Sequence, residues 1–501
     1  MKDELPPSWV ESTVGESFFE VRNGTSVTQN ADGKGLPVSR IESIQNSRFD
    51  LQRIRHIEKL PREALENFRY RLGDIALSHI NSYERVGKTA LYEGEPETFI
   101  HGMNLLRLRL GHDEIEPRFA HLFMQTNFFR EEVRKRVGHA VNQVSINQKN
   151  LAEVPLIVAP LGEQRRIVAK LEKLLGKVDG CQQRLAKIPV LLKRFRQSVL
   201  AVACSGRLTA GWREENPVNE SASDLLVRIG AVLKGVRRVV EPPQDGEIDS
   251  SLLTTDGLPG SWAFSRLGLC FEQVKNGTTA AQNTEGNGHP VTRIETIQNF
   301  QFDLNRIRYT EELDADDLAT FRYQPGDIAF SHINSFEHVG KTALYAGEPS
   351  VLVHGMNLLR LRLGHDFLKP RFIHLFMRTE FFRNEVRMRV GHAVNQVSIN
   401  QKNLAQVPLV IPPLPEQQEI VRRVEALFAL ADQLEARCAK AKAHVEKLTQ
   451  SILTKAFRGE LVPQDPNDEP ASILLERIRS QRSQGSESKQ KRKRANLAAV
   501  G

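Results

Sequence analysis

The sixteen residues VGHAVNQVSINQKNLA run from Val137 to Ala152, and the same sixteen letters run again from Val390 to Ala405. The offset of 253 residues recurs elsewhere: SHINSYERVGKTALY begins at Ser78 and SHINSFEHVGKTALY at Ser331. It holds without a gap from about residue 5 to about residue 208 of the first copy. Solenoid repeats have periods of roughly 20–50 residues, so this unit is a whole duplicated domain with its connector. The sequence therefore predicts a pseudo-dimer on one polypeptide.

The composition points to a globular protein with an anionic partner. The chain has 501 residues, 40% of them apolar, and a formal net charge of +8. The length predicts more than one domain, and the charge favours a partner such as nucleic acid. The four cysteines have no cysteine at the matching position of the other copy, which argues against a shared zinc site or disulfide framework. With no apolar run of 18 residues and no apolar signal core at the start, the predicted location is the cytoplasm.

The first part of each copy has the pattern of a mixed α/β domain. Residues Asn104–Gly111 alternate leucines with Leu105, Arg107 and Arg109, which predicts a strand with one face in a core and one largely basic face. Shorter strands are expected around Ile41–Ile44 and Asp74–Leu77. Residues Pro117–Val137 are predicted to be helical, with Asn127 as the cap of a second segment. The apolar side of these helices is expected to hold Phe119, Leu122, Phe123, Phe129 and Val133.

The second part of each copy carries an apolar heptad pattern, which predicts a long coiled-coil helix of about 35–40 residues. Pro189 interrupts the first pattern and predicts a kink. The apolar positions of the first copy are Ile167, Leu171, Leu174, Val178, Cys181, Leu185, Ile188, Leu192, Phe195, Val199 and Val202, and those of the second are Ile420, Val424, Leu427, Ala431, Leu434, Cys438, Ala441, Val445, Leu448 and Ile452.

The expected fold is therefore α/β (α+β): two duplicated mixed domains joined by two long antiparallel helices with a pseudo-two-fold axis. The linker should hold one short amphipathic helix, SDLLVRIGAVLKGVRR, and the C-terminal SQRSQGSESKQKRKRANLAAVG has the composition of a disordered basic tail. The predicted boundaries are 1–162 and 256–415 for the two domains, 163–205 and 416–458 for the helices, 206–255 for the linker and 459–501 for the C-terminal segment.

Known catalytic patterns are absent from the sequence. Gly-Lys-Thr occurs in both copies, but the phosphate loop needs a glycine where Ser82 and Ser335 stand. No amino-methylating, dinucleotide-binding or His-Glu-x-x-His pattern is present, and no catalytic or metal-binding residue is predicted. Histidines 79, 101, 121 and 139 recur in both copies without a nucleophile beside them, so packing or DNA contact is expected of them.

A polar, hydrogen-bonding set recurs instead. Arginine suits guanine and asparagine or glutamine suits adenine through paired bonds to base edges, while lysine holds phosphates. Turn, cap and buried-network roles are the alternative for many of these residues. The candidate DNA contacts are Gln29, Asn30, Arg40, Gln45, Asn46, His79, Asn81 and Lys88 in the first copy, and Gln282, Asn283, Arg293, Gln298, Asn299, His332, Asn334 and Lys341 in the second.

Two pairs of segments resemble a known family. PLGEQRRIVAKLE from Pro160 and PLPEQQEIVRRVE from Pro413 are similar to the boundary motif of the specificity subunit of type I DNA restriction-modification systems. LLKRFRQSVLAVACSGRLT from Leu191 and KLTQSILTKAFRGELV from Lys447 resemble the ends of that family's helices. The order of recognition domain, helix, recognition domain and helix covers essentially the whole chain.

The resemblance implies a subunit without an active site or cofactor of its own. Each domain would read one half of a bipartite DNA site, with the helices as a spacer. Modification subunits, two in number, would bring S-adenosylmethionine and adenine methylation. Restriction subunits would add ATP- and Mg-dependent translocation and cleavage. Arg165, Arg166, Arg422 and Arg423 flank the heptad patterns and are the predicted contacts to modification subunits.

Two other functions remain open from the residues alone: a self-contained nucleic-acid enzyme with an active site at the pseudo-dimer interface, and a regulator that binds inverted-repeat DNA. The near-identity of the copies makes a further prediction. Two identical readers on a two-fold axis read the same sequence on opposite strands, so an interrupted, nearly palindromic site is expected. Departures should follow differences such as Val27-Thr28 against Ala280-Ala281 and Ser47-Arg48 against Phe300-Gln301.

Overall fold

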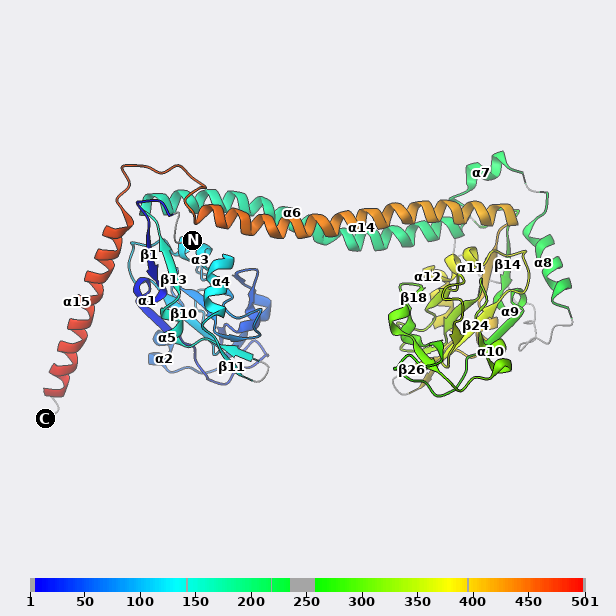
Figure 1. The fold of residues 1–501 in the computed structure, drawn as a ribbon, viewed down its shortest axis with the longest axis horizontal. Coiled ribbons are helices and arrows are strands. Elements are labelled where there is room, and N and C mark those ends of the chain that lie inside the picture. Colours follow the sequence, from blue (N-terminus) through cyan, green and yellow to red (C-terminus); the bar gives the residue numbers. More distant parts are fainter. Residues whose placement is uncertain (1–4, 141–142, 218, 235–256, 394–395, 499–501) are drawn as a thin grey trace. The chain divides into compact units, whose positions relative to one another are not determined.

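A computed structural model describes residues 5–140, 143–217, 219–234, 257–393 and 396–498. The chain divides into two compact units (Figure 1). Unit 1 comprises Met1–Ala186 and Ala439–Gly501, and unit 2 comprises Lys187–Cys438. Each unit therefore holds one copy of the α/β domain together with part of both long helices.

The domain of unit 1 is built around an antiparallel sheet in the order β2-β10-β7-β9, with a second sheet in the order β11-β12-β8. Strand β1 pairs with β13 and so joins the two ends of the domain. The strands are β1 (Val10–Thr13), β2 (Glu20–Asn23), β3 (Leu36–Val38), β4 (Ile44–Gln45), β5 (Arg48–Phe49), β6 (Arg55–Ile57), β7 (Ile75–Ser78), β8 (Ile80–Asn81), β9 (Thr89–Leu91), β10 (Leu105–Arg109), β11 (Gly138–Ala140), β12 (Gln143–Ser145) and β13 (Pro155–Val158), and the helices are α1 (Val14–Ser17), α2 (Arg62–Phe68), α3 (Pro117–Met124), α4 (Asn127–Arg134) and α5 (Gln148–Ala152).

The domain of unit 2 repeats this topology. Its sheets have the matching orders β15-β24-β20-β22 and β21-β26-β25, and β14 pairs with β27. Its strands are β14 (Ala263–Arg266), β15 (Gln273–Asn276), β16 (His289–Thr292), β17 (Ile297–Gln298), β18 (Gln301–Phe302), β19 (Arg308–Thr310), β20 (Ile328–Ser331), β21 (Ile333–Asn334), β22 (Thr342–Leu344), β23 (Val353–His354), β24 (Leu358–Arg362), β25 (Gly391–Ala393), β26 (Gln396–Ser398) and β27 (Pro408–Ile411), and its helices are α9 (Leu267–Cys270), α10 (Ala315–Phe321), α11 (Pro370–Met377), α12 (Glu380–Arg387) and α13 (Gln401–Ala405).

The predicted strands and helices of the domain are confirmed with adjusted ends. Strand β10 occupies the predicted alternating stretch, and the five predicted apolar residues of α3 and α4 are all buried. Around Ile41 the structure has a short 3₁₀ helix, Ile41–Ser43, before the two-residue strand β4. The predicted cap Asn127 is wrong by one residue, because the side chain of Thr126 accepts the hydrogen bond from the Phe129 amide and Asn127 is the first residue of α4. Threonine caps a helix by the same hydroxyl chemistry as serine.

Two long helices, α6 (Leu161–Cys204) and α14 (Leu414–Ala456), follow the domains. They have 44 and 43 residues, more than the roughly 35–40 expected from the heptad pattern, because both begin within the boundary motif and extend past the last apolar position. Helix α6 continues through Pro189. In unit 1 the start of α6 (Ile167) and the end of α14 (Leu453) share one core with the domain. In unit 2 the matching residues, Ile420 of α14 and Leu200 of α6, do the same.

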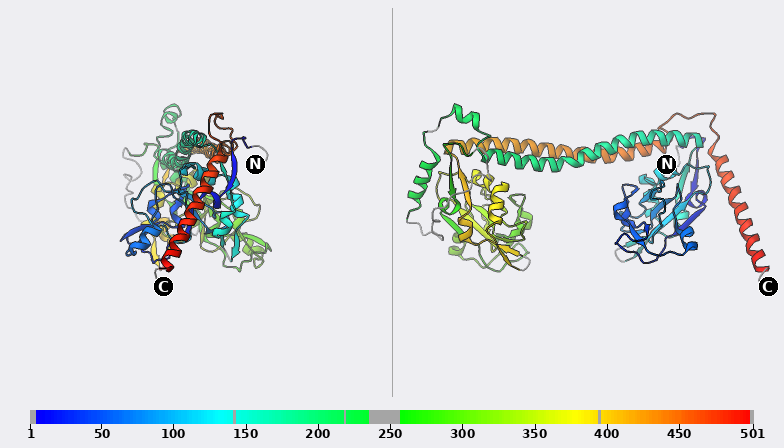
Figure 2. Two further views of the ribbon diagram at one scale, coloured as in Figure 1. Left: turned by 90° about the vertical axis from the view of Figure 1, so that its left-hand side faces the viewer. Right: turned by 180° about the vertical axis from the view of Figure 1, so that it is seen from behind.

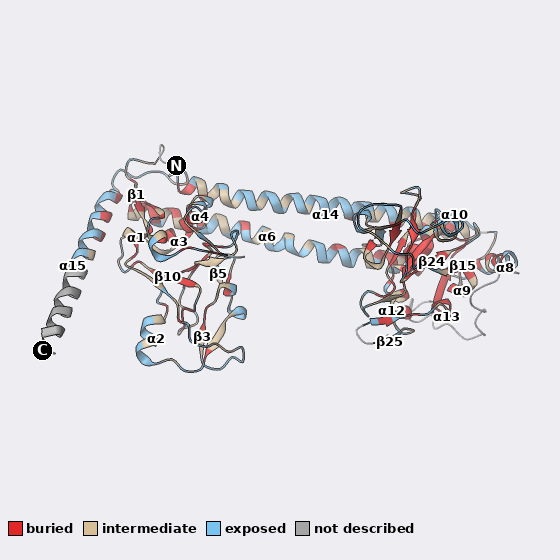
Figure 3. Ribbon diagram, turned by 60° about the horizontal axis from the view of Figure 1, so that its bottom comes forward, coloured by how far each residue is buried: buried red, intermediate tan, exposed pale blue. Residues whose placement is uncertain are grey.

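The heptad positions vary in burial along the two helices (Figure 3). Residues near the domains, such as Leu171 and Val424, are fully buried, while Phe195, Leu434 and Leu448 are 37–43% exposed and Cys181 is exposed. A pair of helices leaves the edges of its seam open to solvent where no third element covers it. The seam is thus confirmed, with its tightest contacts where each domain joins.

The Glu-Gln pair of the boundary motif ties each domain to the start of its helix. Glu163 Oε2 accepts a 2.8 Å hydrogen bond from Trp9 Nε1, and Glu416 does the same for Trp262. The neighbouring Gln164 is fully buried, donates to the Ala159 carbonyl and accepts from the Glu116 amide. A buried polar group needs such partners, which explains why this pair of residues stands at this position.

The two carboxylates differ in their other partners. Glu416 forms a 2.7 Å ion pair with Arg213 and accepts from the Thr209 hydroxyl. Glu163 instead accepts from the neutral amide of Gln464. Burial raises the pKa of Glu163, and this effect outweighs the hydrogen bonds from Trp9 and Gln464. The ionised form of Glu163 is therefore a cost to folded unit 1, whereas that of Glu416 is paired.

This difference gives a matched prediction. A carboxyl group with a raised pKa stabilises the fold at low pH, and that contribution is lost as the pH rises through the pKa of the folded state. At pH 7 the Glu163 carboxylate therefore adds little stability, and Glu163→Gln should change the unfolding free energy by less than about 1 kcal/mol. Glu416→Gln should lower it by about 2–3 kcal/mol, somewhat less than a fully buried broken pair because Arg213 keeps some exposure. Denaturant melts of both variants check this; equal losses would contradict it.

Each unit is completed by a helix that follows the long pair. In unit 2, α7 (Ala210–Glu215) is followed by α8 (Ala222–Val232), which contacts α9 and confirms the predicted amphipathic helix. In unit 1, α15 (Ala471–Ala498) contacts the matching α1 (Figures 1 and 2). Arg482 of α15 donates to the carbonyls of Gly15, Glu16 and Phe18. Most of the linker, residues 235–256, lies outside the described residues.

Helix α15 continues to Ala498, where the composition predicts a disordered tail. The buried apolar residues Leu475 and Ile478 lie in the first turns of this helix. The residues beyond are mostly serine, glutamine, lysine, arginine and alanine, several of which are favourable in helices as well as common in disordered segments. Composition alone therefore did not decide between the two states.

Candidate nucleic-acid interface

The identical sixteen-residue stretch folds into a hairpin and a short helix. Strands β11 and β12 form the hairpin, β12 pairs with β8, and Asn147 caps α5 by accepting from the Asn150 amide. Residues 141–142 at the hairpin tip lie outside the described residues. Val144 and Ile146 are buried, while Gln143 and Ser145 between them are exposed. The buried apolar residues thus anchor the stretch, and its polar side chains lie on the exposed side.

In unit 2 this hairpin borders an open polar depression, called here the hairpin hollow. Its polar lining residues are Asn276, His332, Ser398, Asn400, Gln401 and Lys402. Each is the same residue in unit 1: Asn23, His79, Ser145, Asn147, Gln148 and Lys149. Amide, hydroxyl, imidazole and ammonium groups are the chemistry that contacts base edges and phosphates, and no carboxylate stands among the described lining residues.

Four residues of the hairpin hollow are available to an outside partner. Asn276, Ser398 and Lys402 are exposed and Gln401 is partly buried. Asn400 is occupied as the helix cap of α13. Burial lowers the pKa of His332, although a hydrogen bond with the Asn357 backbone opposes that effect. His79 has the same shift with the Asn104 backbone. In both histidines Nδ1 is buried and the ring bonds to the backbone, so these side chains support the hollow from below its surface.

The structure brings some of the predicted DNA contacts to this place. His79 and Asn81 adjoin the hairpin, because the His79 carbonyl accepts from the Ile146 amide and Asn81 pairs with Val144 in the sheet. His332 and Asn334 occupy the same positions in unit 2. The side chain of Asn81 also shapes the following turn, with Oδ1 accepting from the Ser82 amide at 2.9 Å. Asn23, Ser145, Gln148 and Lys149 are not among the predicted contacts, although their identity in both copies was an available signal.

Three of the other predicted contacts, Asn30, Arg40 and Gln45, have local partners. Asn30 closes a turn through the Lys34 carbonyl, and Gln45 donates to the Glu42 carbonyl. Arg40 is 3.3 Å from Glu42, and Gln29 Nε2 is buried. In unit 2 the same roles fall to Asn283, Gln298 and Arg293, and Gln282 Oε1 is buried. Lys88 and Lys341 follow the loops after β8 and β21.

Asn46 and Asn299 are turn residues with a positive φ of 48°. Asn46 and Ser47 close the β4–β5 hairpin, since a two-residue turn of this kind needs positive φ at both positions. In unit 1 this turn lines a cleft between the domain and the long helices, together with Gln125 and Leu175. In unit 2, Phe300 and Phe428 instead lie 4.9 and 5.0 Å from the Arg378 guanidinium. Asn46 and the Phe300 position thus face the long helices.

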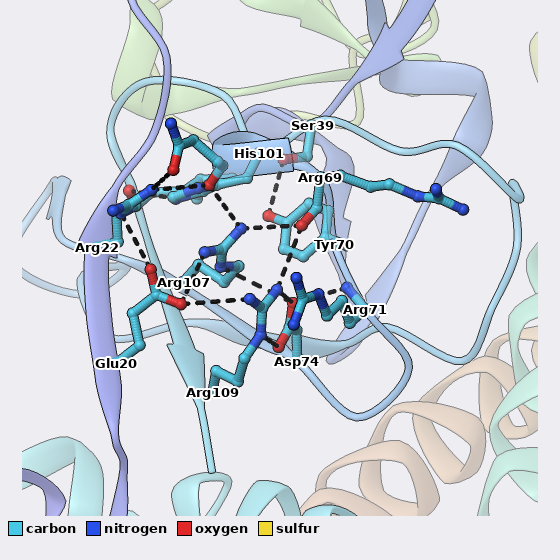
Figure 4. Close-up of polar contacts among 12 residues, drawn as sticks. Glu20, Arg22, Ser39, Arg69, Tyr70, Arg71, Asp74, His101, Arg107 and Arg109 are labelled. Atoms are coloured by element: carbon cyan, nitrogen blue, oxygen red, sulfur yellow. Dashed lines mark hydrogen bonds and ion pairs between the residues drawn. The ribbon is translucent and has the colours of Figure 1, made fainter. Parts of the chain in front are cut away.

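The predicted basic face of β10 is corrected by the structure (Figure 4). Arg107 is 1% exposed and donates to the carbonyls of Asn67 and Arg69. Arg109 forms hydrogen bonds of 2.7 and 2.6 Å with Asp74. Glu20 lies 3.0 Å from Arg107. The arginines form an internal network that joins the sheet to the segment after α2, a role that strand alternation alone does not distinguish from an exposed basic face.

The predicted partner-binding arginines divide into two kinds. Arg166 forms a 2.5 Å ion pair with Asp468, and Arg423 bonds to Glu419 and the Leu208 carbonyl. Arg422 is 69% exposed beside Glu419, and Arg165 is exposed. The first two help to hold the segments that follow the long helices, which leaves Arg165 and Arg422 as the accessible pair.

Neither a metal centre nor a membrane-spanning segment is found in the described parts of the chain. Across residues 5–140, 143–217, 219–234, 257–393 and 396–498, no three or more His, Cys, Asp or Glu side chains group as metal ligands. Within the same ranges, every helix is too short or too polar to cross a bilayer.

Comparison with known proteins identifies the family. The family described as the type I restriction modification DNA specificity domain matches residues 6–190 and 259–442. The EcoKI specificity subunit of Escherichia coli K12 is 30% identical over 98% of this chain and 99% of its own length, and the StySPI specificity subunit of Salmonella potsdam is 28% identical over 99% and 100%. A solved chain from work on complex assembly and conformational transition of the type I R-M system shares the fold, with a TM-score of 0.61 at 19% identity over 91% of this chain and 99% of that one. The enzyme and regulator alternatives find no support here. The chain belongs to the family of DNA specificity subunits of type I restriction-modification systems.

Proposed function

We propose that this subunit reads an interrupted, nearly palindromic DNA site, with one half-site bound by each domain. The observation that supports this most is the identity of the hairpin hollow: all six polar lining residues recur on matching elements of the other unit. Identical readers related by a two-fold axis bind the same sequence on opposite strands. In each unit the domain shares its core with one helix start and one helix end, so both readers are attached to the helices in the same way.

Departures from the palindrome are expected where exposed residues of the copies differ. Val27 and Thr28 are exposed, and Ala280 and Ala281 replace them in unit 2. Ser47-Arg48 against Phe300-Gln301 is the other difference predicted to matter. Since the Ser47 and Phe300 positions face the helices, we expect Val27-Thr28 to have the larger effect on reading. A mismatched base costs about 1–3 kcal/mol, so one such difference is enough to split a half-site.

The chemistry is assigned to partner subunits. Modification subunits, two in the assembled complex, would bind S-adenosylmethionine and methylate one adenine in each half-site. Restriction subunits would supply ATP- and Mg-dependent translocation and cleavage. The exposed Arg165 and Arg422 would contact the modification subunits. The proposal keeps the domain boundaries predicted from the sequence. It also includes a cytoplasmic location, where the genomic DNA is.

Reconstitution tests this assignment. Modification subunits alone should leave a random plasmid library unmethylated at adenine, and addition of this chain should produce methyladenine at one interrupted motif. The chain alone should methylate nothing, because it is proposed to recognise the DNA sequence and to have no catalytic site. Methylation by the chain without partners would support an enzyme and contradict the proposal. Methylation with partners but without a shared motif would contradict sequence reading.

A further inference from the structure

The Gly-Lys-Thr segment that fails as a phosphate loop has a defined place in unit 1. It ends the loop after β8, where the Gly87 amide donates to the Ser78 carbonyl. Gly87 has a φ of +79°, and a Cβ there would lie 3.1 Å from Val133 of α4. The loop therefore rests directly on α4, and glycine permits both the backbone angle and the close approach.

This contact gathers four cations, called here the cation cluster: Arg85 and Lys88 from the loop, and Arg130 and Arg134 from α4. Arg134 donates to the carbonyls of Tyr83 and Glu84 and so fixes the loop to the helix. Burial lowers the pKa of Lys88, with further contributions from Arg85 and Arg130. Burial also lowers the pKa of Arg130, and Arg134 adds to that shift. The four charges are thus close enough to disfavour one another.

No ion pair within the described residues neutralises the cation cluster. In the chain, the loop directly follows β8, whose counterpart β21 lines the hairpin hollow of unit 2, and α4 directly precedes β11 of the hairpin. Arg130 also lines the cleft beside the long helices. Unpaired like charges at short range repel, and a polyanion removes that repulsion by replacing released counterions. The phosphates of a DNA duplex bound beside the base-reading surface would supply such a polyanion.

Unit 2 has the same scaffold with a weaker charge. His338 stands in place of Arg85, so one permanent charge is missing. Glu380 stands in place of Asn127 and lies 3.4 Å from Arg387, the counterpart of Arg134. Lys341 and Arg383 complete the set. The copies therefore match in the hairpin hollow and differ beside it.

We infer that the cation cluster of unit 1 holds the DNA phosphate backbone beside its half-site, and that its counterpart in unit 2 holds it more weakly. The inference rests on the proposed DNA-reading function and adds an asymmetry to it. The two half-sites have the same base contacts, but the phosphate contacts are stronger at the half-site bound by unit 1. Backbone contacts carry no sequence information, so this asymmetry is compatible with a palindromic site.

The copies supply their own matched variants for the test. Arg85→His with Asn127→Glu gives unit 1 the residues of unit 2, and His338→Arg with Glu380→Asn does the reverse. Each side chain already occurs on the same scaffold in the other copy. The complex of this chain with its modification subunits is titrated with a duplex carrying its site at about 50–300 mM salt, where the slope of log affinity against log salt counts phosphate contacts.

The first pair should reduce the magnitude of the salt slope by about 1–2 and weaken binding about tenfold near physiological salt. The second pair should increase both by similar amounts. Thermal melts of the variants exclude unfolding as the cause. Unchanged slopes for both pairs would overturn the inference while leaving DNA reading intact. Failure of the unaltered complex to prefer the site over random duplex would instead refute the proposed function.

Discussion

Replacing Asp74 by alanine is expected to lower the unfolding free energy of unit 1 by about 3–5 kcal/mol, the usual cost of breaking a buried ion pair. The Asp74 side chain is 1% exposed and accepts hydrogen bonds from the Arg109 guanidinium and from the Arg71 amide. Its loss leaves Arg109 and the buried Arg107 with Glu20 as their remaining carboxylate. Hydrogen exchange followed by mass spectrometry, read separately over the peptides of each unit, measures the effect.

Unit 2 supplies the controls for this network. Asp327→Ala should destabilise unit 2 to at least the same extent, because Asp327 holds Arg362 in the same way and Gln273 replaces the second carboxylate. Glu20→Gln should cost less than about 1 kcal/mol, since Gln273 occupies that position in unit 2 and accepts from Arg360 at 2.9 Å. Normal protection of β10 in the Asp74 variant would contradict the structural role of the network.

Replacing Gln148 by alanine is expected to relax base preference at one position in one half-site and to weaken specific binding by about 1–3 kcal/mol, roughly 5- to 150-fold. The side chain of Gln148 is exposed on α5, and its counterpart Gln401 lines the hairpin hollow. Because a palindromic site has equivalent halves, Gln401→Ala should have the same effect on binding and specificity. Competition with duplexes substituted at each base position measures both.

A neighbouring lysine distinguishes base reading from backbone contact. Lys149→Ala should weaken binding to all sequences alike and reduce the salt slope by about 1, as expected for a phosphate contact. Gln45→Ala is the matched glutamine control, because that side chain is bonded to the Glu42 carbonyl and lies outside the hairpin hollow. Different phenotypes for the Gln148 and Gln401 variants would argue against equivalent readers.

The architecture was predictable to the extent that periodicity and repetition decide it. The offset of 253 residues revealed the duplication, and the heptad pattern revealed α6 and α14, because a repeated apolar spacing has one structural solution. Strand alternation located β10 but misplaced Arg107 and Arg109. A buried arginine and an exposed one have the same sequence pattern when their acidic partners, here Glu20 and Asp74, lie far along the chain.

The candidate site was harder to predict for a related reason. Asparagine and glutamine bind base edges, but they also close turns and cap helices. Asn30, Gln45 and Asn46 have such local roles, and only the fold shows it. The hairpin hollow joins β15, β21, β26 and α13, which are distant in sequence, so its members could be grouped only after the chain was folded.

The central claim is that two nearly identical readers address one interrupted palindrome. Base-resolution mapping of methyladenine in the native genome tests it most directly, with a strain lacking this gene as the reference. The account predicts one motif that disappears in the reference strain, with two half-sites that are reverse complements or nearly so and one methylated adenine in each half. Two unrelated half-sites, each methylated at full occupancy, would contradict it.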